Sequence, residues 1–164
     1  MEKLMGLLKV KVVRGVNLAK RDARGSDPYV VIRMGNQKVK TSVKKKDVNP
    51  EWNEELTLSV SDPTVPIKLE ILDKDTFTKD DLMGEADFTI HDLAEVAQMN
   101  LSSIAHDTIV KTLHPTKQNS FVSDSHVTVK NGKVFQDLHL RLKNVDTGDI
   151  YLQLQWVKIT PSAH

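Results

Sequence analysis

The chain has 164 residues, a length that suits one domain with a sizeable core. Its formal net charge of +1 argues against nucleic-acid binding, which requires a marked basic excess. The absence of cysteine excludes disulfides and thiolate metal sites, and fits a reducing compartment. No apolar run approaches the roughly 20 residues that span a bilayer, and the N-terminal segment lacks the features of a signal peptide. We therefore expect a single cytoplasmic domain spanning residues 1–164.

Short segments of alternating apolar and polar residues follow one another along most of the chain. The first places Leu8, Val10 and Val12 between lysines, which is the period of a half-buried strand. A nearly continuous apolar segment and six further short runs lie at 29–34, 38–43, 56–60, 67–71, 86–90, 138–142 and 150–156. Turn residues such as Gly35-Asn36 and Asp62-Pro63 separate them. Seven or eight such strands predict an all-β antiparallel sandwich.

The segment 91–136 interrupts this pattern. Asp92 and Glu95 have the spacing of a capping box, so we expect a short helix from Asp92 to Asn100. Segments 108–113 and 126–129 predict extra short strands on either side of a polar loop. The whole insert is long for a connection within a sandwich, and long loops are often functional. A surface insertion without a partner is the alternative.

Five aspartates in two short stretches stand at predicted strand ends: Asp22, Asp27, Asp73, Asp75 and Asp81. Calcium takes roughly 6–8 oxygen ligands, and carboxylates on flexible loops supply them. Crowded carboxylates also repel one another unless a cation neutralises them. The alternative for any single aspartate is a turn, where its side chain mimics a backbone bend. For a single aspartate the turn is the favoured interpretation, and the five together make calcium a candidate ligand that needs support from the rest of the chain.

Lysines cluster at Lys38, Lys40, Lys44, Lys45 and Lys46. Because Lys38, Lys40, Lys44 and Lys46 share one parity, an extended chain would present these four on one face. Each basic residue near an anionic membrane contributes about 1 kcal/mol of attraction. The alternative is an ordinary solvated face.

Four motifs have the order and spacing of C2 domains: GSDPYV at 25–30, NPEWNEEL at 49–56, LDKD at 72–75 and DLMGEA at 81–86. The stretch at 130–145 and the opening GLLKVKVVRGVNL at 6–18 more closely resemble the plant C2-domain abscisic-acid-related (CAR) proteins. The resemblance implies an eight-stranded antiparallel C2 β-sandwich, with an inserted segment at about 91–136 that contains a short helix and extra short strands. It also implies calcium and phospholipid binding by loops at one end of the sandwich.

The resemblance assigns the calcium ligands position by position. Asp22 and Asp27 match the first loop, Asp73 and Asp75 the third loop, and Asp81 the last ligand of that loop. Asp80 is adjacent, but the spacing to Leu-Met-Gly favours Asp81. Backbone carbonyls near Arg21 and Lys74 are expected to complete the shell. The first loop is one residue shorter than in many calcium-binding C2 domains, which leaves the number of ions open.

The resemblance also implies lipid contacts. Phe77 occupies a loop-tip position that enters the bilayer interface, where burying it contributes roughly 2 kcal/mol. The lysines that match a basic groove for phosphoinositide headgroups are Lys38 and Lys40, and Tyr29 and Arg33 match further groove positions. The sequence departs from the groove pattern of C2 domains at two positions: Val31 stands where lysine is frequent, and Leu72 stands where an aromatic residue is frequent.

Catalytic motifs such as a nucleophile elbow, a Walker loop or H-E-x-x-H are absent from the sequence, so we expect no enzyme activity of the chain itself. The resemblance implies a calcium-dependent adaptor that recruits abscisic acid receptors of the PYR/PYL type to the plasma membrane and so promotes abscisic acid signalling. The alternatives are a GTPase-activating regulator of a YchF-type G protein and a calcium-independent protein scaffold. Peripheral attachment to the plasma membrane, a nuclear pool and self-association on membranes are further expectations.

Overall fold

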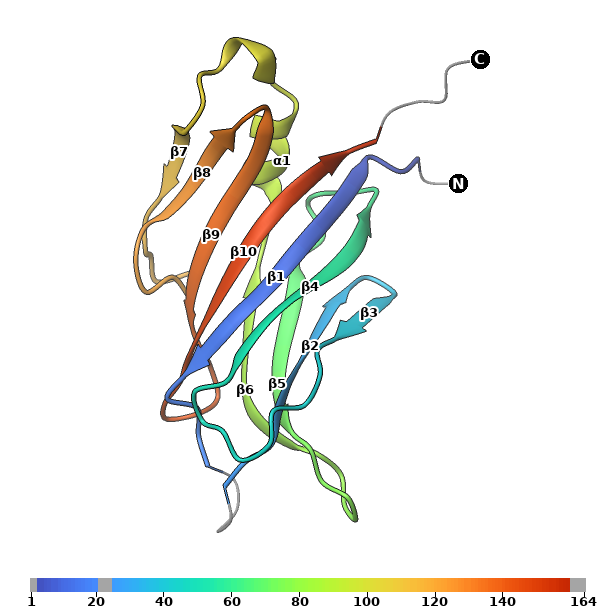
Figure 1. Cartoon of the computed structure of the whole chain (residues 1–164), viewed down its shortest axis with the longest axis vertical. Helices are drawn as coiled ribbons and strands as arrows, with labels where there is room; N and C mark the ends of the chain where they lie inside the picture. The colour runs from blue at the N-terminus through green and yellow to red at the C-terminus, as the bar shows by residue number, and fades with distance from the viewer. Residues whose placement is uncertain (1–2, 21–24, 160–164) are drawn as a thin grey trace.

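Two antiparallel sheets face each other in the computed structural model, which describes residues 3–20 and 25–159 (Figure 1). The larger sheet has the order β4-β1-β10-β9-β8-β7, formed by Glu51–Val60, Gly6–Val16, Asp149–Lys158, Lys133–Arg141, Ser125–Lys130 and Thr108–Leu113. The smaller sheet has the order β3-β2-β5-β6, formed by Gln37–Lys40, Pro28–Met34, Ile67–Asp73 and Asp81–Phe88. The predicted C2 sandwich, with extra strands from the inserted segment, is confirmed.

The core lies between the sheets and is built from the inward-facing residue of each alternating pair. On β1, Leu8, Val10 and Val12 are fully buried, while the lysines between them remain partly exposed. Val30, Ile32, Ile67, Leu69 and Ile71 supply the opposite layer from β2 and β5. Alternation with a period of two therefore selects both the strands and the face that each strand buries.

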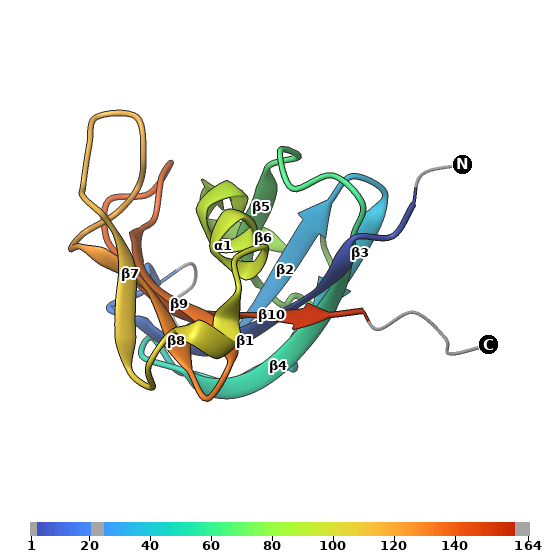
Figure 2. The same cartoon turned by 90° about the horizontal axis from the view of Figure 1, so that it is seen from above.

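The inserted segment closes one end of the sandwich and widens the larger sheet. Helix α1 (His91–Ala97) lies between the two layers when the molecule is seen from above (Figure 2), and a short 3-10 turn, Leu101–Ser103, follows it. Strands β7 and β8 then continue the six-stranded sheet beyond β9. The predicted helix and the two extra strands are confirmed, although β9 begins at Lys133, so the predicted end of the insert at Gln136 falls inside a strand. Neither helix in the described residues has the length and apolar character needed to cross a membrane.

The predicted capping box is wrong. Helix α1 has Ile90 at its N-cap position, and no side chain caps that end. Asp92 and Glu95 instead both accept hydrogen bonds from the Lys111 ammonium on β7, at 2.9 Å in the case of Glu95. The Lys111 ammonium carries a full positive charge and can donate to both carboxylates, whereas a backbone N–H is uncharged, so the ion pairs with the neighbouring strand are favoured. These contacts join α1 to the edge of the larger sheet.

Gly84 is required where β6 passes the loop after β9. Its φ of +137° lies in a region that side chains other than glycine rarely adopt, and an added Cβ would lie 2.9 Å from Leu142 Cβ. Gly132 also has a positive φ, of +74°, but no atom lies within 4 Å of the position where its Cβ would be. The two glycines therefore differ in the room available for a side chain: Gly84 has none, and Gly132 faces open space.

We expect Gly84→Ala to lower the free energy of unfolding by about 2–4 kcal/mol, because backbone strain and overpacking act together. Gly132→Ala introduces backbone strain without overpacking, so it should lower the free energy of unfolding by only about 1–2 kcal/mol. Denaturant unfolding of both variants measures the difference. Equal losses would contradict the close packing of Gly84 against Leu142.

Candidate metal-binding and membrane-binding site

Strand register brings three of the predicted calcium ligands to one end of the smaller sheet. Asp73, the last residue of β5, pairs with Pro28 on one side and with Asp81 on the other. Asp27 directly precedes Pro28, and its N–H donates to Asp73 Oδ1 at 2.8 Å. The side chain of Asp73 is almost fully buried, with 5% of the residue exposed. Asp27, Asp73 and Asp81 therefore stand at the ends of three adjacent strands, as predicted.

The lysine-rich loop between β3 and β4 runs alongside these strand ends. The N–H of Lys44 donates to the Pro28 carbonyl at 2.9 Å, and the N–H of Asp47 donates to the Ser26 carbonyl at 3.1 Å. Between them, the Lys46 N–H donates to Asp27 Oδ1 at 2.8 Å. A carboxylate of the predicted metal site therefore holds the backbone of the basic loop.

The predicted four-lysine face is wrong beyond β3. That strand ends at Lys40, and Lys46 has a positive φ of 52°. The alternation of an extended chain therefore holds for Lys38 and Lys40 alone, and the later lysines follow the bends of a loop. The physical reason is the set of hydrogen bonds that ties this loop to residues 26–28.

The loop between β5 and β6 folds around Asp75. Its Oδ1 accepts the N–H of Phe77 at 2.9 Å and the N–H of Thr78 at 3.2 Å. These bonds, that from Phe77 foremost, hold the pKa of Asp75 below its ordinary value. They also fix the tip of the loop, where the Phe77 side chain is 93% exposed. Phe77 therefore does not fold back onto the core, and its ring is available at the tip.

Asp80 carries contacts that the sequence did not reveal. Its Oδ2 accepts the hydroxyl of Tyr29 from β2, and its Oδ1 accepts the N–H of Asp75 at 2.9 Å. The hydrogen bond from Tyr29 is the main reason that the pKa of Asp80 lies below its ordinary value. Burial, followed by the bond to Asp80, raises the pKa of Tyr29 to about 12. Asp80 thus joins the third loop to the outer face of the smaller sheet.

The described residues match calcium in donor type. Asp27, Asp75 and Asp81 offer hard carboxylate oxygens, and a carboxylate that uses one oxygen in a hydrogen bond retains the lone pairs of the other. Within residues 3–20 and 25–159, no three histidine, aspartate or glutamate side chains converge as a metal-binding group. Asp22 and the carbonyl near Arg21 lie outside the described residues. The ligand set, including the carbonyl near Lys74, stays a prediction.

The predicted headgroup groove lies on the outer face of the smaller sheet. Lys38 stands directly opposite Arg33, and Lys40 opposite Val31. Val31 is only 2% exposed, so neighbouring side chains cover the middle of the groove. At the end near the calcium loops, the hydroxyl of Tyr29 is bound by Asp80. The structure therefore places the four predicted contact residues on one face, but it does not leave them equally available.

The chain resembles known proteins over nearly its full length. Residues 6–104 match the C2 domain family. A protein of Oryza sativa subsp. japonica named GTPase activating protein 1 is 56% identical over 159 residues, which cover 97% of this chain and 96% of the relative. Protein C2-DOMAIN ABA-RELATED 4 of Arabidopsis thaliana is 49% identical over 162 residues, which cover 99% of this chain and 92% of the relative. This chain is a member of the plant C2-domain ABA-related family.

A solved structure shares the fold of this C2 domain. A C2 domain of plant Extended Synaptotagmin 1 superposes with a TM-score of 0.64 at 25% identity, and the match covers 97% of this chain and 99% of that one. C2 domains are mostly membrane-binding modules without catalytic activity, and they generally bind calcium. The predicted family is confirmed.

The link between Tyr29 and Asp80 can be tested by titration. The sequence has two tyrosines, so in a Tyr151→Phe background the phenol of Tyr29 titrates alone. We expect a pKa of about 12, and Asp80→Asn should lower it while leaving it above the ordinary value of 10.0, because burial is the larger cause. Ultraviolet absorbance of the phenolate measures both values.

The direction in which stability changes with pH follows from the protonation state of Tyr29 that the fold favours, which is the protonated one. The stability that protonated Tyr29 contributes is complete below its unfolded pKa and is lost as the pH rises through about 12. Glu70→Gln is the matched control, because Glu70 is the smallest of the causes that raise this pKa. A larger shift for Glu70→Gln than for Asp80→Asn would contradict the described contact.

Proposed function

We propose that this C2 domain is a calcium-dependent phospholipid-binding adaptor that recruits abscisic acid receptors of the PYR/PYL type to the plasma membrane. The observation that carries the proposal is the row of Asp27, Asp73 and Asp81 at one end of the smaller sheet. The exposed ring of Phe77 stands on the loop that joins the last two of these strand ends. The names of the ABA-related relatives support the signalling context.

Each part of this end has a separate role in membrane binding. A bound calcium ion supplies positive charge that neutralises the carboxylates and attracts anionic headgroups. Phe77 enters the interface and contributes roughly 2 kcal/mol, as expected for a buried phenylalanine. The lysines of the neighbouring loop add an attraction that salt screens over about 8 Å. Asp27 orders that loop through the Lys46 N–H, so the acidic and basic parts act together.

The inserted segment supplies a surface for a protein partner. Helix α1 and the 3-10 turn lie at the end of the molecule opposite the loop that carries Phe77 (Figure 1). The exposed apolar residues of the segment include Ile109 on β7, which is 54% exposed, and Val122 on the loop that follows. A membrane at one end would leave this surface accessible to a receptor. Residence at the plasma membrane, a nuclear pool and self-association on membranes remain part of the proposal.

Asp27→Asn tests the calcium site. The amide keeps an oxygen that can accept the Lys46 N–H but removes the charge, so the loop is retained while the cation loses a ligand. We expect vesicles rich in phosphatidylserine to require about 10–100-fold more calcium for half-maximal sedimentation. Asp107→Asn is the matched control, because Asp107 is an exposed carboxylate that directly precedes β7 in the inserted segment. Unchanged calcium dependence in Asp27→Asn would overturn the assignment of this ligand.

Activation of a YchF-type GTPase is the second candidate function, and it is favoured by the name of the rice relative that is 56% identical. The two candidate functions differ in the effect that the inserted segment has on the protein it binds. An adaptor captures a receptor without affecting any turnover, whereas a GTPase regulator raises the rate of GTP hydrolysis by the partner.

Substitutions on the inserted segment distinguish the candidates. Phe121 packs against the core, so the exposed residues around it are the ones to change. We expect Lys117→Ser with Val122→Ser to weaken receptor capture about tenfold and to leave calcium-dependent vesicle sedimentation within about twofold of wild type. If wild type instead accelerates GTP hydrolysis by the purified G protein and the double variant does not, the second candidate replaces the first. Full receptor capture by the variant would place the recognition surface elsewhere.

A further inference from the structure

A cleft of about 520 Å³ separates the start of α1 from the loop that follows β7. One wall comes from the end of β6 and the start of α1, with Phe88, Thr89 and Asp92. The other comes from the end of β7 and the loop after it, with Leu113 and Phe121. This volume lies in the range of roughly 300–1,000 Å³ that is typical of ligand sites. None of the described calcium-ligand or lipid-contact candidates lines this cleft.

Hydrogen bonds hold both walls of the cleft in place. The contacts of Lys111 described above join α1 to β7. In the loop, Asn119 Oδ1 accepts the N–H groups of Thr116 and Phe121, each at 3.1 Å. The side-chain amide of Asn119 also donates to the His114 carbonyl at 3.1 Å. A site whose walls are already ordered loses little conformational freedom when a ligand binds.

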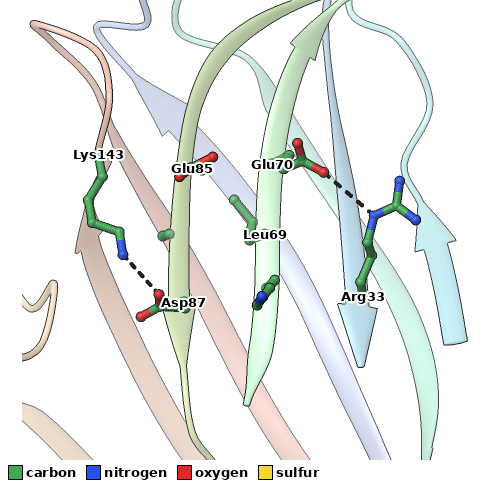
Figure 3. Close-up of a pocket in the computed structure, with 8 residues that line it drawn as sticks. Arg33, Leu69, Glu70, Glu85, Asp87 and Lys143 are labelled. Atoms are coloured by element: carbon green, nitrogen blue, oxygen red, sulfur yellow. Dashed lines mark hydrogen bonds and ion pairs between the residues drawn. The ribbon is translucent and has the colours of Figure 1, made fainter. Parts of the chain in front are cut away.

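The cleft carries negative charge. Its lining contains the carboxylates of Asp87 and Asp92 and, among the described residues, no lysine or arginine. Together with Glu95, these carboxylates share two ammonium groups. Lys143 binds Asp87 at 2.9 Å (Figure 3), and Lys111 binds both Asp92 and Glu95. One negative charge is left without a counter-charge, so a cation suits the cleft better than an anion does.

Both carboxylates of the lining can accept further hydrogen bonds. Within residues 3–20 and 25–159, Asp87 Oδ1 and Asp92 Oδ2 have no hydrogen-bond donor. An ionised carboxylate has about four acceptor positions, so one lysine contact does not exhaust it. The ion pair between Asp87 and Lys143 is about half exposed, and pairs of this kind contribute little. A second cation can therefore bind these oxygens without a large loss elsewhere.

A buried acceptor lies behind one wall of the cleft. Ser125 on β8 stands directly opposite Leu113, so their side chains share one face of the sheet. Gln136, which is 1% exposed, donates from Nε2 to Ser125 Oγ at 3.0 Å. Its Oε1 has no hydrogen-bond partner in the part of the chain that the structure describes. Buried polar groups without a partner are rare in folded proteins, so this region has acceptors in excess of donors.

The remaining lining is apolar, and it includes Leu113 and Phe121. A ligand with many donors on an apolar stem matches both parts of the cleft. Arginine has this form, because its methylene groups pack against apolar surface while its guanidinium carries five N–H donors. The planar fork of arginine can also donate to two carboxylates at once, whereas lysine offers a single point charge.

We infer that an arginine side chain of a protein partner binds in this cleft, with its stem against Leu113 and Phe121 and its guanidinium bound by Asp87 and Asp92. The inference deepens the function proposed above, because it names the chemistry by which the inserted segment recognises a protein. It rests on that function only for the identity of the partner.

Titration of the full chain with Nα-acetylarginine methylamide, followed by NMR of the backbone amides, tests the cleft. We expect saturable shifts at Thr89, Thr112 and Gln118, which line it. The citrulline analogue has nearly the same shape without the charge and should bind at least about tenfold more weakly. Asp87→Asn should weaken binding of the arginine derivative about tenfold. Asp107→Asn removes the same charge from an exposed position of the inserted segment outside the lining and should change the affinity less than twofold.

Three results of this titration would overturn the inference: equal binding of the citrulline analogue, equal losses in the two variants, or shifts confined to other parts of the chain. Thermal unfolding separates a binding role of Asp87 from a structural one. Because its ion pair with Lys143 is exposed, Asp87→Asn should unfold at the same temperature as wild type. A lower unfolding temperature together with the loss of affinity would indicate a structural role and overturn the assignment of Asp87.

Capture of a purified PYR/PYL receptor separates this inference from the proposed function. Asp87→Asn should weaken capture about tenfold, and the arginine derivative, but not its citrulline analogue, should compete with the receptor. Equal capture by Asp87→Asn and wild type would overturn the assignment of the cleft to this partner. If wild type captures no receptor, the proposed function fails, and the titration with the arginine derivative still decides whether the cleft binds a guanidinium group.

Discussion

Repulsion between carboxylates at one end of the smaller sheet is the constraint on which the rest of the site depends. Two unit charges a few ångströms apart near a protein surface repel by several kcal/mol, so such groups need hydrogen-bond donors or cations. Asp73 Oδ1 accepts the Asp27 N–H, Asp75 Oδ1 accepts two N–H groups of its own loop, and Asp80 accepts the Tyr29 hydroxyl. These donors order two loops, the one that ends at Asp27 and the one between β5 and β6, even before a cation contributes.

The strands and the core were predictable because each strand buries one face. The inner positions of β1 repeat every second residue, and the same pattern identifies β5, β9 and β10. The short helix was also predictable, but its capping was not. Lys111, which donates hydrogen bonds to the carboxylates of Asp92 and Glu95, lies on a strand that contacts the helix only in the folded chain. Local spacing cannot identify a partner supplied by tertiary contact.

In the candidate site, too, some features were predictable from the sequence and others were not. The resemblance to C2 domains assigns Asp27, Asp73 and Asp81 to one calcium site, which stays a prediction, and strand register places them at neighbouring strand ends. The lysine face failed because the extended strand ends at Lys40, and Lys46 adopts a positive φ. Cross-strand neighbours are equally hidden in a sequence, since Arg33 and Lys68 are far apart along the chain and directly opposite in the sheet. Which charges face one another follows from register, and register depends on the whole fold.

Asp27 links the acidic and the basic halves of this end of the molecule. Its N–H donates to Asp73, its carbonyl accepts the N–H of Lys74, and its side chain accepts the N–H of Lys46. A ligand that binds the ordered arrangement stabilises it by mass action, whichever of the three loops it contacts. A cation held by Asp27 would therefore also favour the conformation that presents the lysine loop. Under the proposed function, calcium binding and electrostatic attraction to a membrane would be coupled through the hydrogen bonds of Asp27, and not through charge alone.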